Sequence, residues 1–329
     1  MAIAQGVRPT GQGTIAPPVA SRRGRFIDGW RRFSRHKLAV VGLFIVGAWI
    51  VCGLFAPWIA PYSYRENNLA VSQQLPSAEH WFGTDRLGRD QLSRLIWAAR
   101  TALIVAPFAV TVSFALGLVF GALAGYLGGW VEAVIMRTVD VLMAFPSLLF
   151  ALLLSVTLKP RLTSMMEASS LLKDLVRSGY AELLIVILAL SVVGWPGLAR
   201  LVRAQVLSAK NSLYIEAARS SGVNTWRIIR QHILPNILAP IIVVLSMSLG
   251  GAVVAESGLS FLGLGVEPPI PSWGNMIIEN ASNGLWRTAN APYLVWAPGA
   301  IVSLLVFAFS FIGDGLNEAL NPQMGEGSR

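Results

Sequence analysis

Charged side chains are scarce in this sequence: aspartate, glutamate, lysine and arginine together make up 13% of its 329 residues. A typical soluble domain has roughly 25%, and here 54% of the residues are hydrophobic. The composition therefore argues against a soluble globular domain, a disordered protein and a coiled coil. In a soluble protein, the net charge of +9 would suggest a nucleic-acid partner. In a membrane protein, the positions of the basic residues instead indicate which segments face the cytoplasm.

Cysteine and histidine are rarer still. The one cysteine, Cys52, lies inside an apolar run, which excludes an intrachain disulfide framework and a thiolate metal cluster. No HExxH, paired-cysteine, GxSxG or phosphate-loop pattern is present. His80, Asp85 and Asp90 could be drawn as metal ligands, but arginines stand beside both aspartates and favour ion pairing. The sequence thus predicts no catalytic residue, no metal site and no cofactor.

Long uncharged runs are what the sequence has instead. A helix that crosses a bilayer needs about 20 mostly apolar residues. Glycine and proline are tolerated in such a helix because neighbouring helices can satisfy the freed backbone groups. The predicted spans are residues 38–60, 100–127, 136–158, 181–199, 236–257 and 295–313. We therefore predict an all-α, polytopic membrane protein with six transmembrane helices in a lipid bilayer.

Basic residues concentrate in two of the connecting segments. Eight lysines and arginines precede the first span, and the loop 200–236 between the fourth and fifth spans holds six against a single acid, Glu216. The positive-inside rule places both segments in the cytoplasm. The segments 61–99 and 159–180 then lie outside, and both termini are cytoplasmic.

The two ends of the chain differ from its apolar middle. Residues 1–24 are rich in glycine, proline, alanine and arginine, and we expect a disordered cytoplasmic tail. The apolar run that follows is too long for a cleaved signal peptide. In residues 25–37, apolar side chains recur at helical spacing among arginines, which predicts an interfacial amphipathic helix. Residues 321–329 form a cytoplasmic C-terminal tail.

A stripe of small residues marks the second span. Gly117, Gly121 and Gly125 follow one another at four-residue spacing, so they share one face of a helix. Such a stripe lets another helix approach closely. We expect ordinary packing within this chain.

Acidic residues lie at the ends of two predicted spans. Asp140 follows Arg137 by three residues, so we expect an ion pair between these two side chains or a helix-end contact. Glu256 closes the fifth span, where water or an arginine can reach it. We assign both acids structural roles, although acids inside membranes are generally functional candidates. No span has an ionisable residue near its midpoint, which argues against an ion-driven carrier.

The loop 200–236 carries the most specific pattern. It contains Glu216-Ala217-Ala218, then Gly222, and further on Leu234-Pro235. This order predicts a short helix, a left-handed turn at the glycine and a second short helix that ends at the proline. A membrane-surface hairpin is the plainer alternative. A DNA-binding helix-turn-helix is remoter, because both ends of the loop run directly into membrane.

These residues resemble the EAA motif of ABC importer permeases, in which Glu-Ala-Ala, a glycine and a Leu-Pro occur at this spacing. The segment His-Ile-Leu-Pro-Asn is similar to the dipeptide and oligopeptide branch, and the resemblance covers about 25–322. Four further segments agree with that branch: 80–94, 256–265, 268–276 and 313–316. The chain is identified as a C-type permease subunit. It departs from the pattern in the longer segment 159–180 and in Asn321-Pro322, where Asp-Pro is usual.

The resemblance implies a type I ABC importer permease-like bundle, with residues 100–320 as its core, in the bacterial cytoplasmic membrane. The implied partners are a second permease subunit, two cytoplasmic ATPase subunits and an extracytoplasmic substrate-binding protein. The chain itself would hydrolyse nothing and would form half of a path for di- or oligopeptides. The implied ATPase-coupling residues are Glu216, Ala217, Ala218, Gly222, Leu234 and Pro235.

Other functions remain open from the sequence. A secondary, ion-coupled transporter would need deep ionisable residues or inverted repeats, and neither is clear. A membrane-embedded enzyme would need a catalytic constellation, and none is visible. Within the importer family, nickel complexes, glutathione or another small solute are alternative substrates.

Overall fold

A computed structural model of the chain describes residues 22–169, 172–282 and 291–320. These residues are helical apart from loops and an isolated bridge between Thr84 and Asp90, which confirms the all-α prediction. The predicted C-terminal tail and residues 1–21 of the predicted N-terminal tail lie outside the described residues.

Six helices are long and apolar enough to cross a membrane, as predicted. They are α2 (Lys37–Leu54), α4 (Gln91–Leu127), α6 (Ser147–Ala168), α8 (Tyr180–Lys210), α11 (Leu234–Phe261) and α13 (Tyr293–Leu320). The shorter elements are α1 (Arg22–Arg35), α3 (Ala56–Ile59), η1 (Leu69–Val71), α5 (Gly129–Met143), α7 (Lys173–Ser178), α9 (Leu213–Ser220), α10 (Thr225–Ile228), η2 (Ile229–Ile233) and α12 (Trp273–Ser282).

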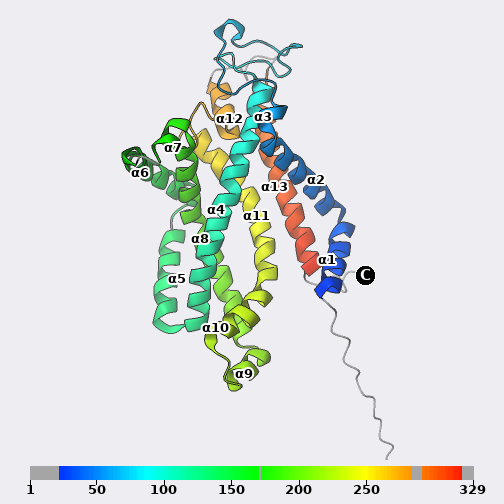
Figure 1. Cartoon of the computed structure of the whole chain (residues 1–329), viewed down its shortest axis with the longest axis vertical. Helices are drawn as coiled ribbons and strands as arrows, with labels where there is room; N and C mark the ends of the chain where they lie inside the picture. Colours follow the sequence, from blue (N-terminus) through cyan, green and yellow to red (C-terminus); the bar gives the residue numbers. More distant parts are fainter. Residues whose placement is uncertain (1–21, 170–171, 283–290, 321–329) are drawn as a thin grey trace, which may run out of the picture.

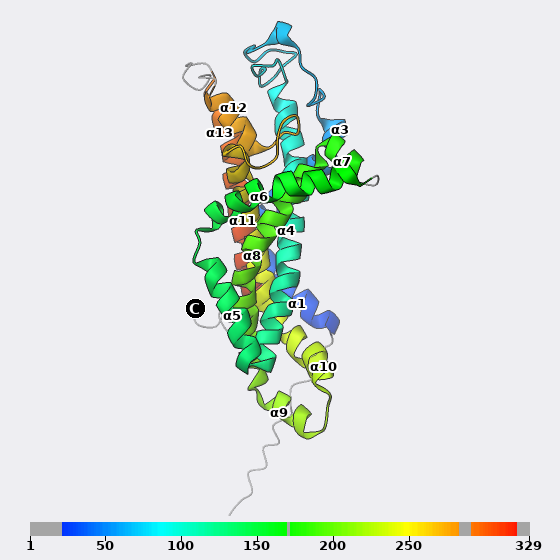
Figure 2. The ribbon, with the colours of Figure 1, turned by 90° about the vertical axis from the view of Figure 1, so that its left-hand side faces the viewer.

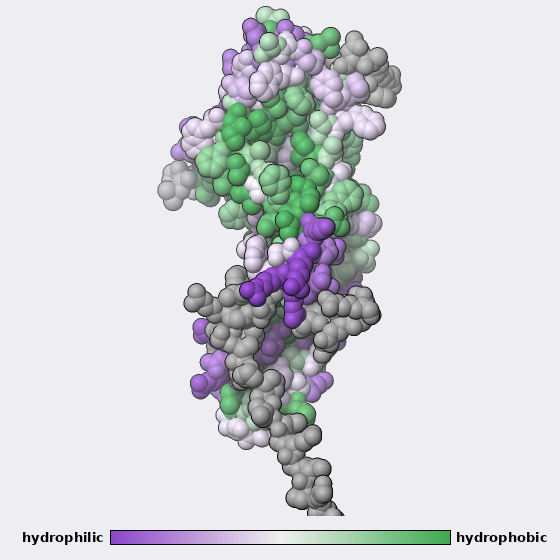
Figure 3. All heavy atoms as spheres, turned by 90° about the vertical axis from the view of Figure 1, so that its right-hand side faces the viewer, coloured by the Kyte–Doolittle hydropathy of each residue, from purple (hydrophilic) through white to green (hydrophobic). Residues whose placement is uncertain are grey.

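The long helices form an elongated bundle. Figure 1 shows α2, α4, α8, α11 and α13 running along its long axis, with α12 near one end and α9 and α10 at the other. Large apolar side chains cover its sides; Phe44 of α2 and Phe307 of α13, for example, are 78% and 58% exposed. In Figure 3 an apolar band lies between a largely hydrophilic upper end and a hydrophilic patch below the band. Such a surface suits a lipid bilayer and not water.

The glycine stripe of α4 packs against α8. A Cβ atom added at Gly121 would lie 2.5 Å from the backbone oxygen of Ala199, and one at Gly117 would lie 2.6 Å from the Cβ of Leu198. Gly125 faces Val206 in the same way, at 2.9 Å. The stripe therefore serves packing within the chain, as expected, and brings the two helix backbones together.

The third predicted span, residues 136–158, is broken. Helix α5 ends at Met143, and α6 begins after Pro146, whose ψ of 123° is extended. A proline has no N–H for the helical ladder and disfavours helical backbone in the residue before it. The helix is interrupted before Pro146, whereas Pro160 lies inside α6 without ending it. Helix α6 instead runs across the bundle (Figure 2). The segment 159–180, expected as a loop, is occupied largely by the end of α6 and by α7.

Polar groups organise the segment between α3 and α4. Asp85 accepts hydrogen bonds from Arg89 Nε at 2.6 Å and from Arg94 Nη1 at 2.7 Å. Both arginines also pair with Glu279 of α12. His80 Nδ1 lies 2.9 Å from Asp90 Oδ1. The ion-pairing interpretation is confirmed, and among the described residues there is no group of three or more potential metal ligands.

These pairs also explain why α4 begins before the predicted span. Asp90 caps the helix by accepting a hydrogen bond from the Ser93 N–H at 2.7 Å. The first turns then contain polar side chains, including Gln91 and Arg94, that are almost completely buried among their partners. A prediction from hydropathy starts the span at residue 100, because hydropathy counts these polar residues as unfavourable in a membrane helix. It takes no account of partners that lie elsewhere in the chain.

Candidate coupling surface and ion-paired pocket

Helix α9 is anchored by one face and exposed on the other. Ile215 is fully buried, in a cluster with Ile228 and Ile233 that also contains residues of α8 and α11. Leu213, by contrast, is 83% exposed, and α9 protrudes at the end of the molecule (Figure 1). The segment 200–236, expected as a loop, begins with the last turns of α8 and ends in the first turn of α11. Between them, α9 is a short helix held on an apolar base, with a free side available to a partner.

The predicted coupling residues of α9 lie mostly on that free side. Glu216 and Ala217 are exposed, whereas Ala218 is half-buried against the apolar cluster. Glu216 forms no ion pair with any residue whose side chain the structure describes. Its charge and the small side chain of Ala217 are thus presented outward, together with the apolar side chain of Leu213.

Gly222 ends the helical part of α9 as predicted. Its φ is +74°, in the left-handed region, and the Val223 N–H donates to the Ala218 carbonyl at 3.1 Å. No atom lies within 4 Å of the position that a Cβ would occupy. The glycine is therefore required by backbone conformation and not by crowding.

The expected end of the second helix at Pro235 is wrong. Helix α10 continues through the π-helical segment η2 directly into α11. The Leu234 N–H donates to the Ile229 carbonyl, five residues back, and Pro235 occupies the first turn of α11. Local π-helical backbone can accommodate the N–H that a proline lacks, so the chain passes into the fifth span without a break.

The structure divides the six predicted coupling residues into two groups. Glu216, Ala217, Ala218 and Gly222 lie on α9 and its turn, whereas Leu234 and Pro235 lie at the start of α11.

A contact that the sequence did not predict joins these two groups. Asn236 Nδ2 donates to the hydroxyl of Tyr214 at 3.2 Å, which links α11 to α9. On the α8 side, Lys210 Nζ donates to the Tyr126 carbonyl at 2.7 Å, which joins the ends of α8 and α4. A displacement of α9 would therefore reach several spans.

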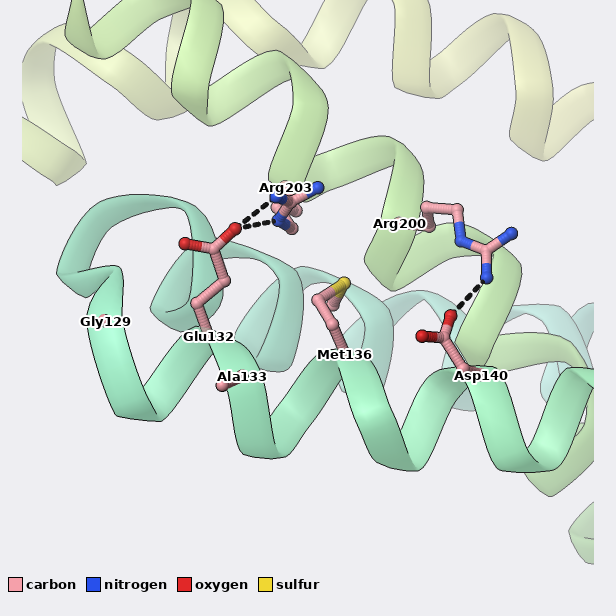
Figure 4. Close-up of a pocket in the computed structure, with 7 residues that line it drawn as sticks. All are labelled: Gly129, Glu132, Ala133, Met136, Asp140, Arg200 and Arg203. Carbon is pink, nitrogen blue, oxygen red and sulfur yellow. Dashed lines mark hydrogen bonds and ion pairs between the residues drawn. The ribbon is translucent and has the colours of Figure 1, made fainter.

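A pocket of about 480 Å³ lies between α5 and α8 (Figure 4). Glu132, Met136 and Asp140 of α5 face it at four-residue spacing. Arg203 Nε donates to Glu132 Oε1 at 2.7 Å, and Arg200 Nη2 donates to Asp140 Oδ1 at 2.7 Å. Two ion pairs two turns apart therefore hold α5 against α8.

The expected pair between Asp140 and Arg137 is wrong, because Asp140 pairs with Arg200 of α8. Helix geometry explains this: Asp140 shares the face of Glu132, which is turned toward α8. The sequence does contain the four residues at helical spacings. Glu132 and Asp140 lie two turns apart in one helix, and Arg200 and Arg203 lie nearly one turn apart in another. Only the fold shows that these two helices are neighbours.

Glu256 also differs from expectation. It is 1% exposed and pairs with no arginine in the part of the chain that the structure describes. Ser260 Oγ donates to its Oε1 at 2.9 Å, and Ser260 Oγ accepts a hydrogen bond from the Val266 N–H at 3.1 Å. Glu256 thus stabilises the end of α11 and the loop that follows it.

Six apolar spans and a protruding helical loop define a polytopic helical membrane protein. Residues 117–326 match the family described as binding-protein-dependent transport system inner membrane component. Residues 24–76 match the N-terminal transmembrane domain of oligopeptide transport permease C. The chain belongs to the family of binding-protein-dependent transport system inner membrane components.

Individual relatives agree with this family. The chain is 39% identical to the dipeptide transport system permease protein DppC of Bacillus subtilis (strain 168), over 90% of this chain and 85% of the relative. It is 36% identical to the oligopeptide transport system permease protein OppC of the same organism, over 90% and 89%. It is 38% identical to the glutathione transport system permease protein GsiD of Pectobacterium atrosepticum, over 90% of each chain.

Proposed function

We propose that this chain is a membrane subunit of an ABC importer for dipeptides or oligopeptides and that α9 is the helix that receives the movement of the ATPase subunits. The observation that carries the proposal is the construction of α9, with Ile215 buried beneath it and Glu216 and Ala217 exposed on it. Family membership and the names of the dipeptide and oligopeptide relatives support the same function.

In this proposal the chain pairs with a second, related permease subunit, and the two together enclose the path. Two ATPase subunits bind on the cytoplasmic side, where α1 and α9 lie, and both termini are cytoplasmic. A binding protein delivers substrate at the opposite end, near α12. The chain contributes no residue to ATP hydrolysis, which belongs to the ATPase subunits.

The coupling step follows from the packing. Closure of the ATPase subunits around nucleotide would displace α9. Because Ile215 packs with Ile228 and Ile233, and Asn236 bonds to Tyr214, the displacement would pass into α8 and α11. These spans would then tilt and expose the path to the other side of the membrane. Leu234 and Pro235 lie where this movement enters the fifth span.

Exchange of Ala217 for tryptophan tests this assignment. Ala217 is exposed, so Ala217→Trp adds bulk to the outward side of α9, whereas a bulky residue at half-buried Ala218 would also disturb the base of the loop. Overpacking costs about 1–3 kcal/mol, which corresponds to about a fivefold to 150-fold weaker interface. We expect transport by the reconstituted complex to fall at least fivefold while the subunit remains inserted and abundant.

The matched control is Ala168→Trp, which adds the same bulk at an exposed alanine of α6. It should leave transport, ATPase activity and co-purification of the ATPase subunits unchanged. Normal transport with full ATPase coupling in the Ala217→Trp complex would show that α9 is only a surface hairpin.

Glutathione is a second candidate substrate, because the relatives named glutathione transport system permease are 38% identical to this chain. Uptake of a labelled dipeptide by the complete complex with its binding protein distinguishes the two. We expect unlabelled di- and oligopeptides to compete and glutathione to compete weakly. Competition by glutathione alone would assign the complex to that solute and leave the coupling proposal untouched.

A further inference from the structure

An apolar hollow of about 330 Å³ lies between α1, α2 and the end of α13. Phe33 of α1 forms its base: its ring is 6% exposed and lies 3.1 Å from the position that a Cβ on Gly315 would occupy. Trp30 stacks on Phe33, with 5.8 Å between the ring centroids, yet remains 55% exposed. Leu43 and Leu316 complete the opposite sides. The hollow is therefore lined by apolar groups but not filled by them.

Its position is the edge of the membrane. Helix α2 begins at Lys37 and α13 ends at Leu320, and the hollow lies beside these two ends. Figure 1 shows α1 next to the end of α13, at an angle to the bundle. A tryptophan on an amphipathic helix at the end of two spans lies at the level of the lipid headgroups.

Exposed cations surround this position. Arg31, Arg32, Arg35 and Lys37 are all exposed, and none forms an ion pair with a residue whose side chain the structure describes. They belong to α1 and the first turn of α2, the elements that line the hollow, and Figure 3 shows a hydrophilic patch directly below the apolar band.

The acids of the adjacent helix end do not neutralise them. In α13, Ile312, Leu316 and Ala319 face the hollow. An α-helix turns by about 100° per residue, so Asp314 and Glu318 lie on the opposite side of α13. The site thus combines an apolar hollow with positive charge that is not paired with any acid whose side chain the structure describes.

We propose that this hollow binds an anionic phospholipid, with an acyl chain against Trp30 and Leu316 and the headgroup on the arginines of α1. Guanidinium groups bind phosphate oxygens through charge-assisted hydrogen bonds. Basic pockets beside membrane-spanning helices are suited to anionic headgroups. A phospholipid matches both parts of the site, because it supplies an apolar chain and a negative charge from within the bilayer.

Native mass spectrometry of the complete complex tests the proposal. The complex is reconstituted with phosphatidylglycerol and phosphatidylcholine in equal amounts, and the lipids that remain bound are counted. We expect one phosphatidylglycerol per copy of this chain to survive conditions that remove phosphatidylcholine. Replacement of three cations, Arg31→Gln with Arg32→Gln and Arg35→Gln, should lower its retention at least tenfold.

A matched control removes three exposed cations from α6 and α7, at Arg161→Gln with Lys173→Gln and Arg177→Gln. It changes the net charge equally and should leave lipid retention unchanged. Equal losses in both triple variants would overturn the proposal, because the lipid would then respond to net charge and not to this site. Equal retention of the two phospholipids by the unmodified complex would overturn it too.

A photoreactive residue identifies the occupant directly. Benzoylphenylalanine in place of Trp30 keeps an aromatic group at the mouth of the hollow. After illumination in the complete complex, an adduct with phosphatidylglycerol supports the proposal. A predominant adduct with phosphatidylcholine or with a protein subunit overturns it. This measurement does not depend on the folding of the arginine variants.

Discussion

At Gly222, the backbone conformation alone restricts which side chains the candidate site can accept. Its φ of +74° is unfavourable for side chains, and the space around it is open. A left-handed conformation costs most non-glycine residues about 1–2 kcal/mol, and β-branched residues tolerate it least. The effect of a substitution here can therefore be assigned to the turn and not to a clash.

We expect Gly222→Val to reduce transport at least fivefold and to uncouple ATP hydrolysis from it, because about 1–2 kcal/mol of backbone strain would disturb the turn after α9. The subunit should remain inserted and abundant. Gly222→Asn is the matched control, since asparagine adopts this conformation more readily, and it should retain most transport. Transport and ATPase activity of the reconstituted complexes check both. Equal transport by the two variants would show that the turn conformation is irrelevant to coupling.

The ion pairs between α5 and α8 differ in exposure. The side chains of Arg200 and Asp140 are 49% and 55% exposed, whereas those of Arg203 and Glu132 are 30% and 25% exposed. Exposed pairs contribute about 0–1 kcal/mol. Removal of one partner from the less exposed pair lowers the free energy of unfolding more, because the remaining charge is poorly hydrated.

Accordingly, Asp140→Asn should lower the free energy of unfolding by at most about 1 kcal/mol, and Glu132→Gln should lower it more. Both should affect the abundance or thermal stability of the purified complex before they affect selectivity between peptides. Thermal unfolding in detergent, combined with uptake competition, separates these effects. A change in selectivity at normal abundance after Asp140→Asn would instead place Asp140 on the substrate path.

At the scale of elements, α4 and α8 pack closely at three successive glycines of α4. Any side chain at Gly121 would meet the backbone of Ala199 or the side chain of Val202. Gly251 of α11 is also in a span, but no atom lies within 4 Å of the position that its Cβ would occupy. The two glycines therefore provide a matched pair for testing helix packing.

We expect Gly121→Ala to destabilise the subunit by about 1–3 kcal/mol, the usual cost of overpacking, because α4 would have to move away from α8. Gly251→Ala should be neutral or slightly stabilising, since alanine favours helices over glycine. The amount of inserted subunit and its resistance to heat in detergent provide the measurement. Equal stability of the two variants would contradict the close approach seen at Gly121.

Most elements could be predicted from the sequence because their signals are local. The six apolar runs, the α9 turn at Gly222 and the close approach at the α4 glycines each depend on a few neighbouring residues. The break at Pro146 could not be predicted from hydropathy, because one proline hardly changes the mean hydropathy of an apolar run. The early start of α4 was missed because Arg94 is stabilised partly by Glu279, far away in the sequence. The partner of Asp140 was missed for the same reason.

For the whole molecule, the orientation in the membrane is the property on which the proposed function depends. Asn67 lies in the segment between α3 and α4, and Ser220 lies in α9; both are exposed. These two segments lie at opposite ends of the molecule (Figure 1). The sequence contains a single cysteine, so Cys52→Ala provides a background without thiols.

In that background, a membrane-impermeant thiol reagent added to intact cells should label Asn67→Cys and not Ser220→Cys. Inside-out membrane vesicles should give the reverse result. The physical reason is the concentration of arginine and lysine before α2 and between α8 and α11, which favours the cytoplasm. Labelling of Ser220→Cys in intact cells would place α9 outside and would remove it from contact with the ATPase subunits.

The glycine contact between α4 and α8 has a consequence for movement. Two helices whose backbones interlock at Gly117 and Gly121 cannot slide past one another without first separating, and Lys210 joins their ends at Tyr126. We therefore expect these two helices to move as one body. In the proposed importer, relative motion between spans would then occur at contacts other than this one. Substitutions that force α4 away from α8 should reduce the amount of folded subunit, whereas those that leave this contact intact should keep the subunit in the membrane.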